Sequence, residues 1–342
     1  MWGWLLPILA LPAAGRLYQI LGERRDARRW PPPGRKTGGF HVADAGGSGP
    51  AVVLEAGIAA SSASWKLVQD ALAPRCRVVS YDRAGLGYSD AAATPRTLDN
   101  LLAELDRVVT AAAVPAPFVL VGHSFGGLMA RHYAARFPGK AGALVLLDPL
   151  EPFEWFPLSD VRRRMLARGA ALSRRGAALA RWGVVRLGLD LLMLGSRRLP
   201  QMLAVAASGK GSEITRRLAG EIRKLPPDVW PRVKSHWCLP RSFLTMAEYL
   251  ERLPQYCAEP LDEAPLRKIP VHVLSAGTTP PEVVAAHRRW AEQSCGGKHL
   301  IVPASGHWLQ LDAPEAVTQA IHAALMQVSR GIWKNGGHSA ER

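Results

Sequence analysis

The chain has 342 residues, of which 48% are hydrophobic and 21% are charged, and its formal net charge is +15. This composition excludes wholesale disorder and allows a sizeable core in one large α/β domain or two small ones. The charge suits an anionic membrane or a solvated basic surface. Because no nucleic-acid-binding module is recognisable, we expect no nucleic-acid partner. The four cysteines are scattered without metal-ligand spacing, so no metal site is predicted and a Cys238–Cys257 bridge has no support.

The first 29 residues combine an apolar run with a basic cluster. Residues 1–15 carry no charge and include Trp2 and Trp4, whereas residues 23–29 are mostly basic. The run is marginal for a membrane span, which needs about 20 apolar residues. Tryptophans suit a membrane interface and arginines suit anionic headgroups, so we predict membrane association through surface contact by residues 1–29. The alternatives are a cytoplasmic or a secreted protein with this run packed on the domain.

Short apolar strands alternate with helical patterns along most of the chain. Residues 30–39 are rich in Pro and Gly and read as a linker, so the folded domain is expected to begin near Phe40. Nearly all-apolar strands that alternate with helices predict a mostly parallel sheet covered on both faces. The strands are expected at 40–43, 51–56, 77–81, 118–121, 143–147, 271–275 and 299–302, and helices at 65–72, 97–113, 127–137, 283–293 and 314–328.

One long stretch, residues 150–266, lacks any strand pattern. It contains Arg-rich helical segments at 160–183 and 184–194 and is too long for a plain loop, so we interpret it as a helical cap inserted after the sixth strand. The predicted division is an apolar N-terminal segment and linker at 1–39, a core at 40–149 and 267–330, the cap at 150–266, and a flexible tail at 331–342.

The most informative motif is Gly-His-Ser-Phe-Gly at residues 122–126. An apolar strand leads into it and a helical pattern follows, which is the setting of a nucleophile elbow. Such a turn holds its serine in a strained conformation, and only tiny residues fit two positions before and after it. Gly122 and Gly126 meet that need. Ser124 is therefore the candidate nucleophile.

A serine needs a base to accept its proton, and ten histidines are available. His307 fits best, because it directly follows the last strand, and Gly306 lets the loop turn tightly beside it. The side chain of His123 is expected to point elsewhere. Three others are predicted to be structural, since they lie on helices (His132, His322) or within a strand (His272).

Taken together, these motifs make the chain resemble the α/β-hydrolase superfamily, specifically its lipase, esterase and haloperoxidase-like branch. The carrying residues are Leu54–Gly57, Tyr81–Ser89, Val121–Gly127, Leu146–Pro149 and Ser305–His307. The resemblance implies the α/β-hydrolase fold and covers residues from about 40 to 328. It is specific for the fold and much less so for the substrate.

The resemblance also implies the remaining parts of the site. It places the two oxyanion N–H groups on Ile58 and Phe125. Many relatives carry the acid after the strand at 271–275, but here that loop has no Asp. Two candidates remain. Asp148, at the end of the strand before the cap, is favoured over Glu282, which is expected to begin a helix. Asp312 is expected to cap the final helix.

The predicted function is a serine hydrolase that cleaves carboxylic esters of apolar or lipid-like small molecules through an acyl-enzyme on Ser124. Ser124 rather than Asp at the elbow argues against chemistry that needs a carboxylate nucleophile. No cofactor and no metal are implied. The alternative is a hydrolase-fold binding or receptor protein with little or no turnover, suggested by the missing acid after residues 271–275. The sequence does not define the oligomeric state.

Overall fold

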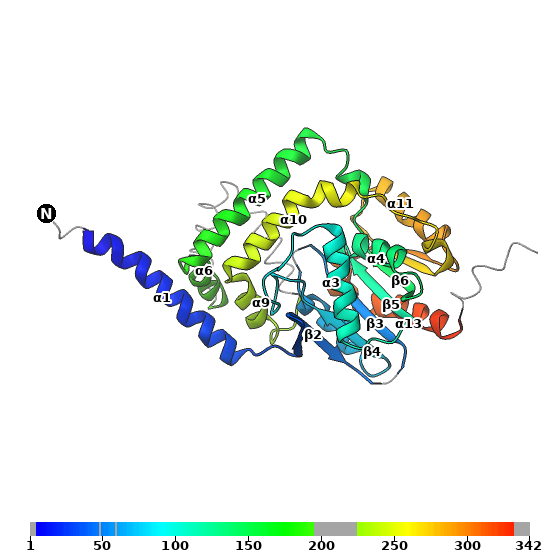
Figure 1. The fold of residues 1–342 in the computed structure, drawn as a ribbon, viewed down its shortest axis with the longest axis horizontal. Helices are drawn as coiled ribbons and strands as arrows, with labels where there is room; N and C mark the ends of the chain where they lie inside the picture. Colours follow the sequence, from blue (N-terminus) through cyan, green and yellow to red (C-terminus); the bar gives the residue numbers. More distant parts are fainter. Residues whose placement is uncertain (1–4, 48, 59, 195–223, 332–342) are drawn as a thin grey trace, which may run out of the picture.

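The computed structural model describes residues 5–47, 49–58, 60–194 and 224–331. Their strands form one eight-stranded sheet in the order β1-β2-β4-β3-β5-β6-β7-β8 (Figure 1). β2 pairs antiparallel with both β1 and β4, and all pairs from β4 to β8 are parallel, so the sheet is mostly parallel, as predicted. The strands are β1 (Arg35–Thr37), β2 (Phe40–Ala45), β3 (Ala51–Glu55), β4 (Arg77–Tyr81), β5 (Phe118–His123), β6 (Ala141–Leu147), β7 (Val271–Ala276) and β8 (His299–Val302).

Helices cover both faces of the sheet, and alternate strand residues supply the two cores. Val53 belongs to the core shared with α3 (Leu98–Ala111), α4 (Phe125–Arg136) and α11 (Pro281–Glu292). Its neighbour Val52 belongs to the core shared with α2 (Lys66–Leu72) and α13 (Pro314–Ser329). This period-two alternation explains why the parallel strands are apolar throughout. Short helical turns are also present: η1 (Ser62–Trp65), η2 (Pro152–Glu154), η3 (Leu266–Lys268) and α12 (Leu309–Asp312).

The described part of the segment between β6 and β7 is helical. It holds α5 (Asp160–Arg181), α6 (Val184–Met193), α9 (Trp230–Trp237) and α10 (Pro240–Ala258). α5 and α10 run side by side above the end of the sheet (Figure 1), and Arg174 on α5 pairs with Glu251 on α10 at 2.7 Å. These helices stand where the sequence predicts the cap, and we use that name for residues 150–266.

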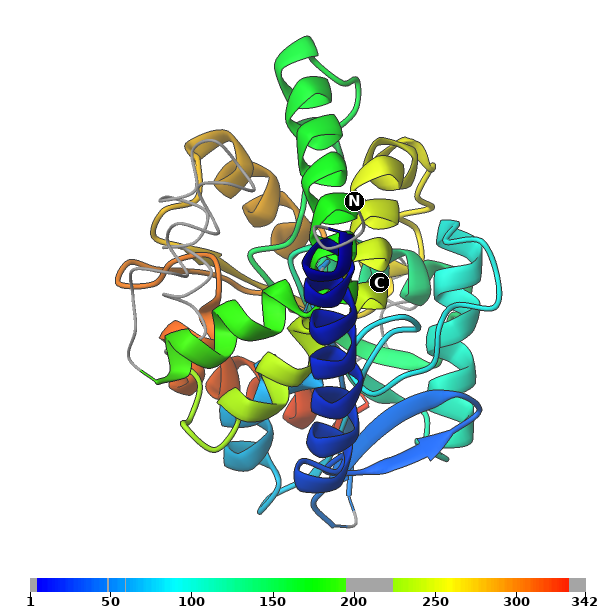
Figure 2. The ribbon, with the colours of Figure 1, turned by 90° about the vertical axis from the view of Figure 1, so that its left-hand side faces the viewer.

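The N-terminal segment forms a helix, α1 (Leu5–Arg29), that contacts α5, α6 and α9 of the cap (Figure 2). A buried polar cluster joins them. Arg186 on α6 is fully buried, pairs with Asp26 at 2.5 Å and donates to Gln19 Oε1 at 3.1 Å. Gln19 in turn donates to the Cys238 carbonyl at 2.7 Å. Hydrogen bonds of Gln19 and the ion pair of Asp26 therefore hold the second half of α1 against the cap.

The sheet begins earlier in the chain than the sequence predicts. β1 lies inside the predicted linker, so the sheet begins five residues before Phe40. None of the described helices combines the length and apolar character needed to cross a bilayer. Trp2, Trp4 and most of the predicted tail lie outside the described residues. Cys238 and Cys257 are both free thiols, in keeping with the lack of support for a bridge.

Candidate active site

The elbow predicted from the Gly-His-Ser-Phe-Gly motif is present in the structure. Ser124 follows β5 directly, α4 begins at the next residue, and the serine has φ 54° and ψ −118°. A Cβ on Gly122 would lie 2.3 Å from the Gly126 carbonyl oxygen, and one on Gly126 would lie 2.4 Å from the Glu55 carbonyl oxygen. Both contacts are with backbone, which cannot yield cheaply, so any larger residue would distort the turn.

The backbone of Ser124 is tied to the turn that follows β6. The Ser124 N–H donates to the Leu147 carbonyl at 2.9 Å, and the Leu150 N–H donates to the Ser124 carbonyl at 3.1 Å. Asp148 lies between these two partners. The elbow and the predicted acid are therefore held next to each other by main-chain bonds, at the carboxyl ends of neighbouring parallel strands.

The structure brings the predicted base and the favoured acid together. His307 Nδ1 lies 2.7 Å from Asp148 Oδ2; the His307 side chain is 48% exposed, and the Asp148 side chain is 10% exposed. Burial alone would raise the pKa of Asp148. The hydrogen bonds from His307, Thr279 and the Ala276 N–H outweigh it and lower that pKa below its usual value. Asp148 is thus held as an acceptor beside an imidazole that remains open to solvent.

The two other carboxylates considered from the sequence lie on helices. Glu282 is exposed in the first turn of α11, which matches the helix-start position expected for it. The expectation for Asp312 was wrong. Asp312 ends α12, and its Oδ2 accepts from the Gly306 N–H at 2.7 Å, which fixes the loop just before His307. The orphan N–H of that tight loop, rather than the start of α13, is what the carboxylate satisfies.

His123 takes part in the site's architecture, although the sequence assigned it no role. Its buried ring contacts the His307 ring at 4.8 Å between centroids, and its Nε2 donates to the His307 carbonyl at 2.8 Å. Burial, followed by repulsion from His307, lowers the pKa of His123 to about 3, so the ring is neutral. His132 and His322 lie on helices and His272 lies in β7, as predicted.

Phe125 and the residue before Ile58 both adjoin the nucleophile. A Cβ on Gly57 would be 3.7 Å from Ser124 Cβ, which places the strand end carrying Ile58 against the serine. The Phe125 N–H is the first of α4, and the first N–H groups of a helix lack intrahelical acceptors. Buried Arg83, which sequence reasoning missed, donates to the carbonyls of Ala56 (2.7 Å) and Gly57 and pairs with Glu55 at 2.5 Å. Arg83 therefore braces the turn before Ile58.

A cavity of about 130 Å³ lies between the cap and the core, next to the residue that follows His307. Its wall includes Trp308, which follows the base, and Ala60 and Ser61, which follow the Ile58 turn. The cap contributes mostly apolar side chains, among them Leu225, Val233, Trp237 and Met246. Ser124 is not among the lining residues. Asp148 and His307 do not line it either, so the cavity meets the candidate site through Trp308 and the turn after Ile58.

Comparison with known proteins identifies the family. The family model for the alpha/beta hydrolase fold matches residues 50–314. The chain belongs to the α/β-hydrolase family. The fold class and family predicted from the motifs are therefore confirmed.

Individual relatives match this chain over short stretches or at low identity. The chain is 41% identical over 97 residues to an AB hydrolase superfamily protein of Gibberella zeae (28% of this chain, 30% of that one). It is 38% identical over 129 residues to lipase LipV of Mycobacterium tuberculosis (37% and 48%). It spans less than half the length of each. Among solved structures, a thermophilic esterase of Thermogutta terrifontis aligns with a TM-score of 0.56 at 22% identity, over 84% of this chain and 93% of that one. An alpha/beta hydrolase of Sphaerobacter thermophilus gives 0.52 at 20% identity, over 82% and 94%. These two likenesses support the fold alone.

Proposed function

We propose that the protein is a serine hydrolase that cleaves carboxylic esters through an acyl-enzyme on Ser124. The observation that carries the proposal is the His307–Asp148 contact of 2.7 Å next to a serine held at φ 54° on an elbow. A hydroxyl on such a turn, a neighbouring imidazole and an ionised carboxylate are the parts that activate a serine. The family match supports a hydrolase, and the ester bond is our own assignment.

In the proposed mechanism, Ser124 Oγ attacks the ester carbonyl while His307 Nε2 accepts its proton. Asp148 holds the imidazole in the required tautomer and stabilises the imidazolium. The Ile58 and Phe125 N–H groups stabilise the oxyanion, and each such donor contributes roughly 3–4 kcal/mol. His307 then protonates the leaving alcohol, and water, activated by the same imidazole, releases the acid and restores Ser124.

The cavity supports an apolar substrate of limited size. Its lining is mostly aliphatic and aromatic, and its volume of about 130 Å³ is close to that of an engineered cavity of about 150 Å³ that holds benzene. We therefore expect short aliphatic or small aromatic acyl groups to be preferred within the apolar and lipid-like class. A p-nitrophenyl ester series from acetate to palmitate tests this, with Ser124→Ala as the control. The account predicts highest kcat/KM at short chains and none in the variant.

A folded protein that binds these esters without hydrolysing any of them would instead support the alternative of a binding or receptor protein. The loop after β7, which lacks an Asp, motivated that alternative. The carboxylate of Asp148 now stands at the imidazole, which favours the enzyme.

We further propose that α1 touches an anionic membrane surface. Leu17 and Leu21 are 56% and 53% exposed, and Arg24 and Arg28 continue the same helical face. Exposed apolar side chains beside arginines suit the boundary between acyl chains and anionic headgroups. At low salt the protein should co-sediment with phosphatidylglycerol vesicles. It should stay in the supernatant with phosphatidylcholine vesicles. Equal retention of a Leu17→Ser/Leu21→Ser variant would contradict the proposal.

A further inference from the structure

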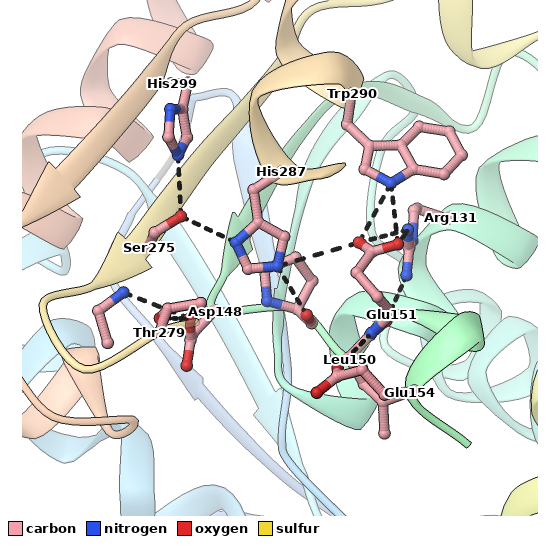
Figure 3. A network of polar contacts seen from close by, with 12 residues as sticks. Arg131, Asp148, Leu150, Glu151, Glu154, Ser275, Thr279, His287, Trp290 and His299 are labelled. Carbon is pink, nitrogen blue, oxygen red and sulfur yellow. Dashed lines mark hydrogen bonds and ion pairs between the residues drawn. The ribbon is translucent and has the colours of Figure 1, made fainter. Parts of the chain in front are cut away.

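A buried polar network close to Asp148 links α4, the helix that follows Ser124, to α11 (Figure 3). The Glu151 carboxylate accepts from Arg131 Nη1 at 2.9 and 3.2 Å and from Trp290 Nε1 at 3.1 and 3.3 Å. The Arg131 and Glu151 side chains are at most 2% exposed. Arg131 also donates to the Leu150 carbonyl at 2.5 Å. A buried ion pair with this many hydrogen bonds is well suited to fixing geometry.

A second branch of the network reaches the residue after Asp148. His287, fully buried on α11, donates from Nε2 to the Pro149 carbonyl at 2.9 Å. Its Nδ1 accepts from Ser275 Oγ at 2.8 Å, and Ser275 Oγ accepts from His299 Nε2 at 2.8 Å. The carbonyl acceptor fixes the tautomer of His287. Burial lowers the pKa of His287, which keeps the ring neutral. Glu151 Oε1 lies 3.9 Å from His287 Nε2, so the two branches of the network adjoin each other.

Between these anchors, Asp148 adopts an unfavourable backbone conformation. Its φ is 42°, in the left-handed region that a non-glycine residue keeps only when its surroundings enforce it. The carbonyls of the next two residues, Pro149 and Leu150, are the ones bonded by His287 and Arg131. The loop after β7 completes the arrangement, because Thr279 Oγ1 donates to Asp148 Oδ1. Contacts from α4, β7 and α11 thus converge on one turn.

We infer that His287 is a positioning residue, which holds the Asp148 turn so that the carboxylate meets His307. Arg131, through Glu151 and Trp290, supports the same turn from the other side. In this chain the β7–α11 region, which carries no Asp of its own, supplies the groups that orient the carboxylate from β6. The kinetic consequence of this inference rests on the proposed function; the geometric consequence does not.

The experiment compares His287→Leu, which removes the donor to the Pro149 carbonyl, with His287→Gln, which retains an N–H donor. His272→Leu is the matched control, since His272 is also a buried histidine but lies in β7 opposite Val145 and bonds Gln327 at 2.6 Å. For His287→Leu we expect kcat to fall about 10- to 100-fold with KM within about twofold of the parent value. The acid limb of its pH–rate profile should move to lower pH, because a misaligned Asp148 no longer stabilises the protonated imidazole. His287→Gln should recover most of kcat, and His272→Leu should keep both kcat and the profile.

A second measurement does not depend on turnover. In proton NMR, the hydrogen-bonded His307 Nδ1–H should give a low-field resonance that is absent from Asp148→Asn. The inference predicts that His287→Leu loses or shifts this resonance, while His287→Gln and His272→Leu retain it. An unchanged resonance and an unchanged pH–rate profile in folded His287→Leu would overturn the inference. Failure of the proposed function would appear differently, as a parent protein that shows the resonance but hydrolyses no ester.

Discussion

Substituting Gly126 with alanine tests the geometry of the elbow at its tightest point. The new Cβ would lie 2.4 Å from the Glu55 carbonyl oxygen and 2.7 Å from that of Ala56. Both are backbone atoms, so the end of β3 or the start of α4 must move by at least about 0.6 Å to reach the closest contact that Cβ atoms tolerate. The end of β3 leads to Ile58, and α4 begins with Phe125. The clash therefore separates the two proposed oxyanion donors.

Two magnitudes follow from this displacement. Overpacking of this kind costs roughly 1–3 kcal/mol of stability. Loss of one aligned oxyanion donor costs about 100- to 1000-fold in kcat. The assay is steady-state hydrolysis of a short-chain p-nitrophenyl ester at a temperature where circular dichroism shows the variant to be fully folded. The control is Gly47→Ala, because a Cβ at Gly47 meets nothing within 4 Å. A folded Gly126→Ala variant with parental kcat would refute the placement of the oxyanion site between β3 and α4.

Three further predictions follow from the same structure. Asp148→Asn should lower kcat by about 10⁴-fold, as loss of a triad carboxylate does, whereas Glu282→Gln should leave it within about twofold; a large loss confined to the second variant would reassign the acid. Thr279→Val removes one of the hydrogen bonds that lower the pKa of Asp148, so that pKa should rise, as an NMR titration of the Asp148 carboxyl carbon would show; an unchanged pKa would contradict the role given to the Thr279 contact. Arg186→Met removes the 2.5 Å partner of buried Asp26 and leaves only the 3.7 Å contact with exposed Arg25, so it should cost up to about 3–5 kcal/mol in urea unfolding, while adding Asp26→Leu should recover much of the loss.

The same low pKa of Asp148 has a consequence for stability. A carboxyl whose pKa is lower in the folded than in the unfolded protein stabilises the fold above its unfolded pKa, near 3.9. That contribution is lost as the pH falls through the lower, folded value. The difference in stability between the parent and Asp148→Asn should therefore shrink on acidification in this range.

The parts of the site that could be predicted from sequence are those fixed by short stretches of chain. Gly122 and Gly126 are required by the turn around Ser124 itself, so five residues suffice to locate it. Asp148 directly follows one predicted strand, and His307 lies on the loop after another. Because parallel strands present their carboxyl ends at one edge of the sheet, strand order alone brings these residues near the elbow.

The network behind Asp148 had no comparable signal. Arg131, Glu151 and Trp290 come from three separate elements, and none of them stands in a motif. Their meeting depends on the tertiary placement of α11 against α4, which no local pattern encodes. The misassignment of Asp312 has a similar origin, since its partner, the Gly306 N–H, is unsatisfied only because the loop folds as it does.

The packing of α1 against the cap could not be predicted from local sequence patterns either. Composition marked residues 1–29 as apolar and then basic, and that pattern suits a membrane surface. It carries no indication that Gln19 and Asp26 turn inward to a fully buried Arg186. Likewise, β1 lies in a Pro- and Gly-rich stretch whose composition predicts a linker, and it becomes a strand by pairing with β2.

The most direct test of the account is to locate the reactive residue by mass spectrometry after treating the folded protein with a fluorophosphonate. The account predicts a single phosphonyl adduct on Ser124, formed much more slowly in His307→Ala and not at all in Ser124→Ala. A folded protein that acquires no adduct, or acquires it on another residue, would contradict it.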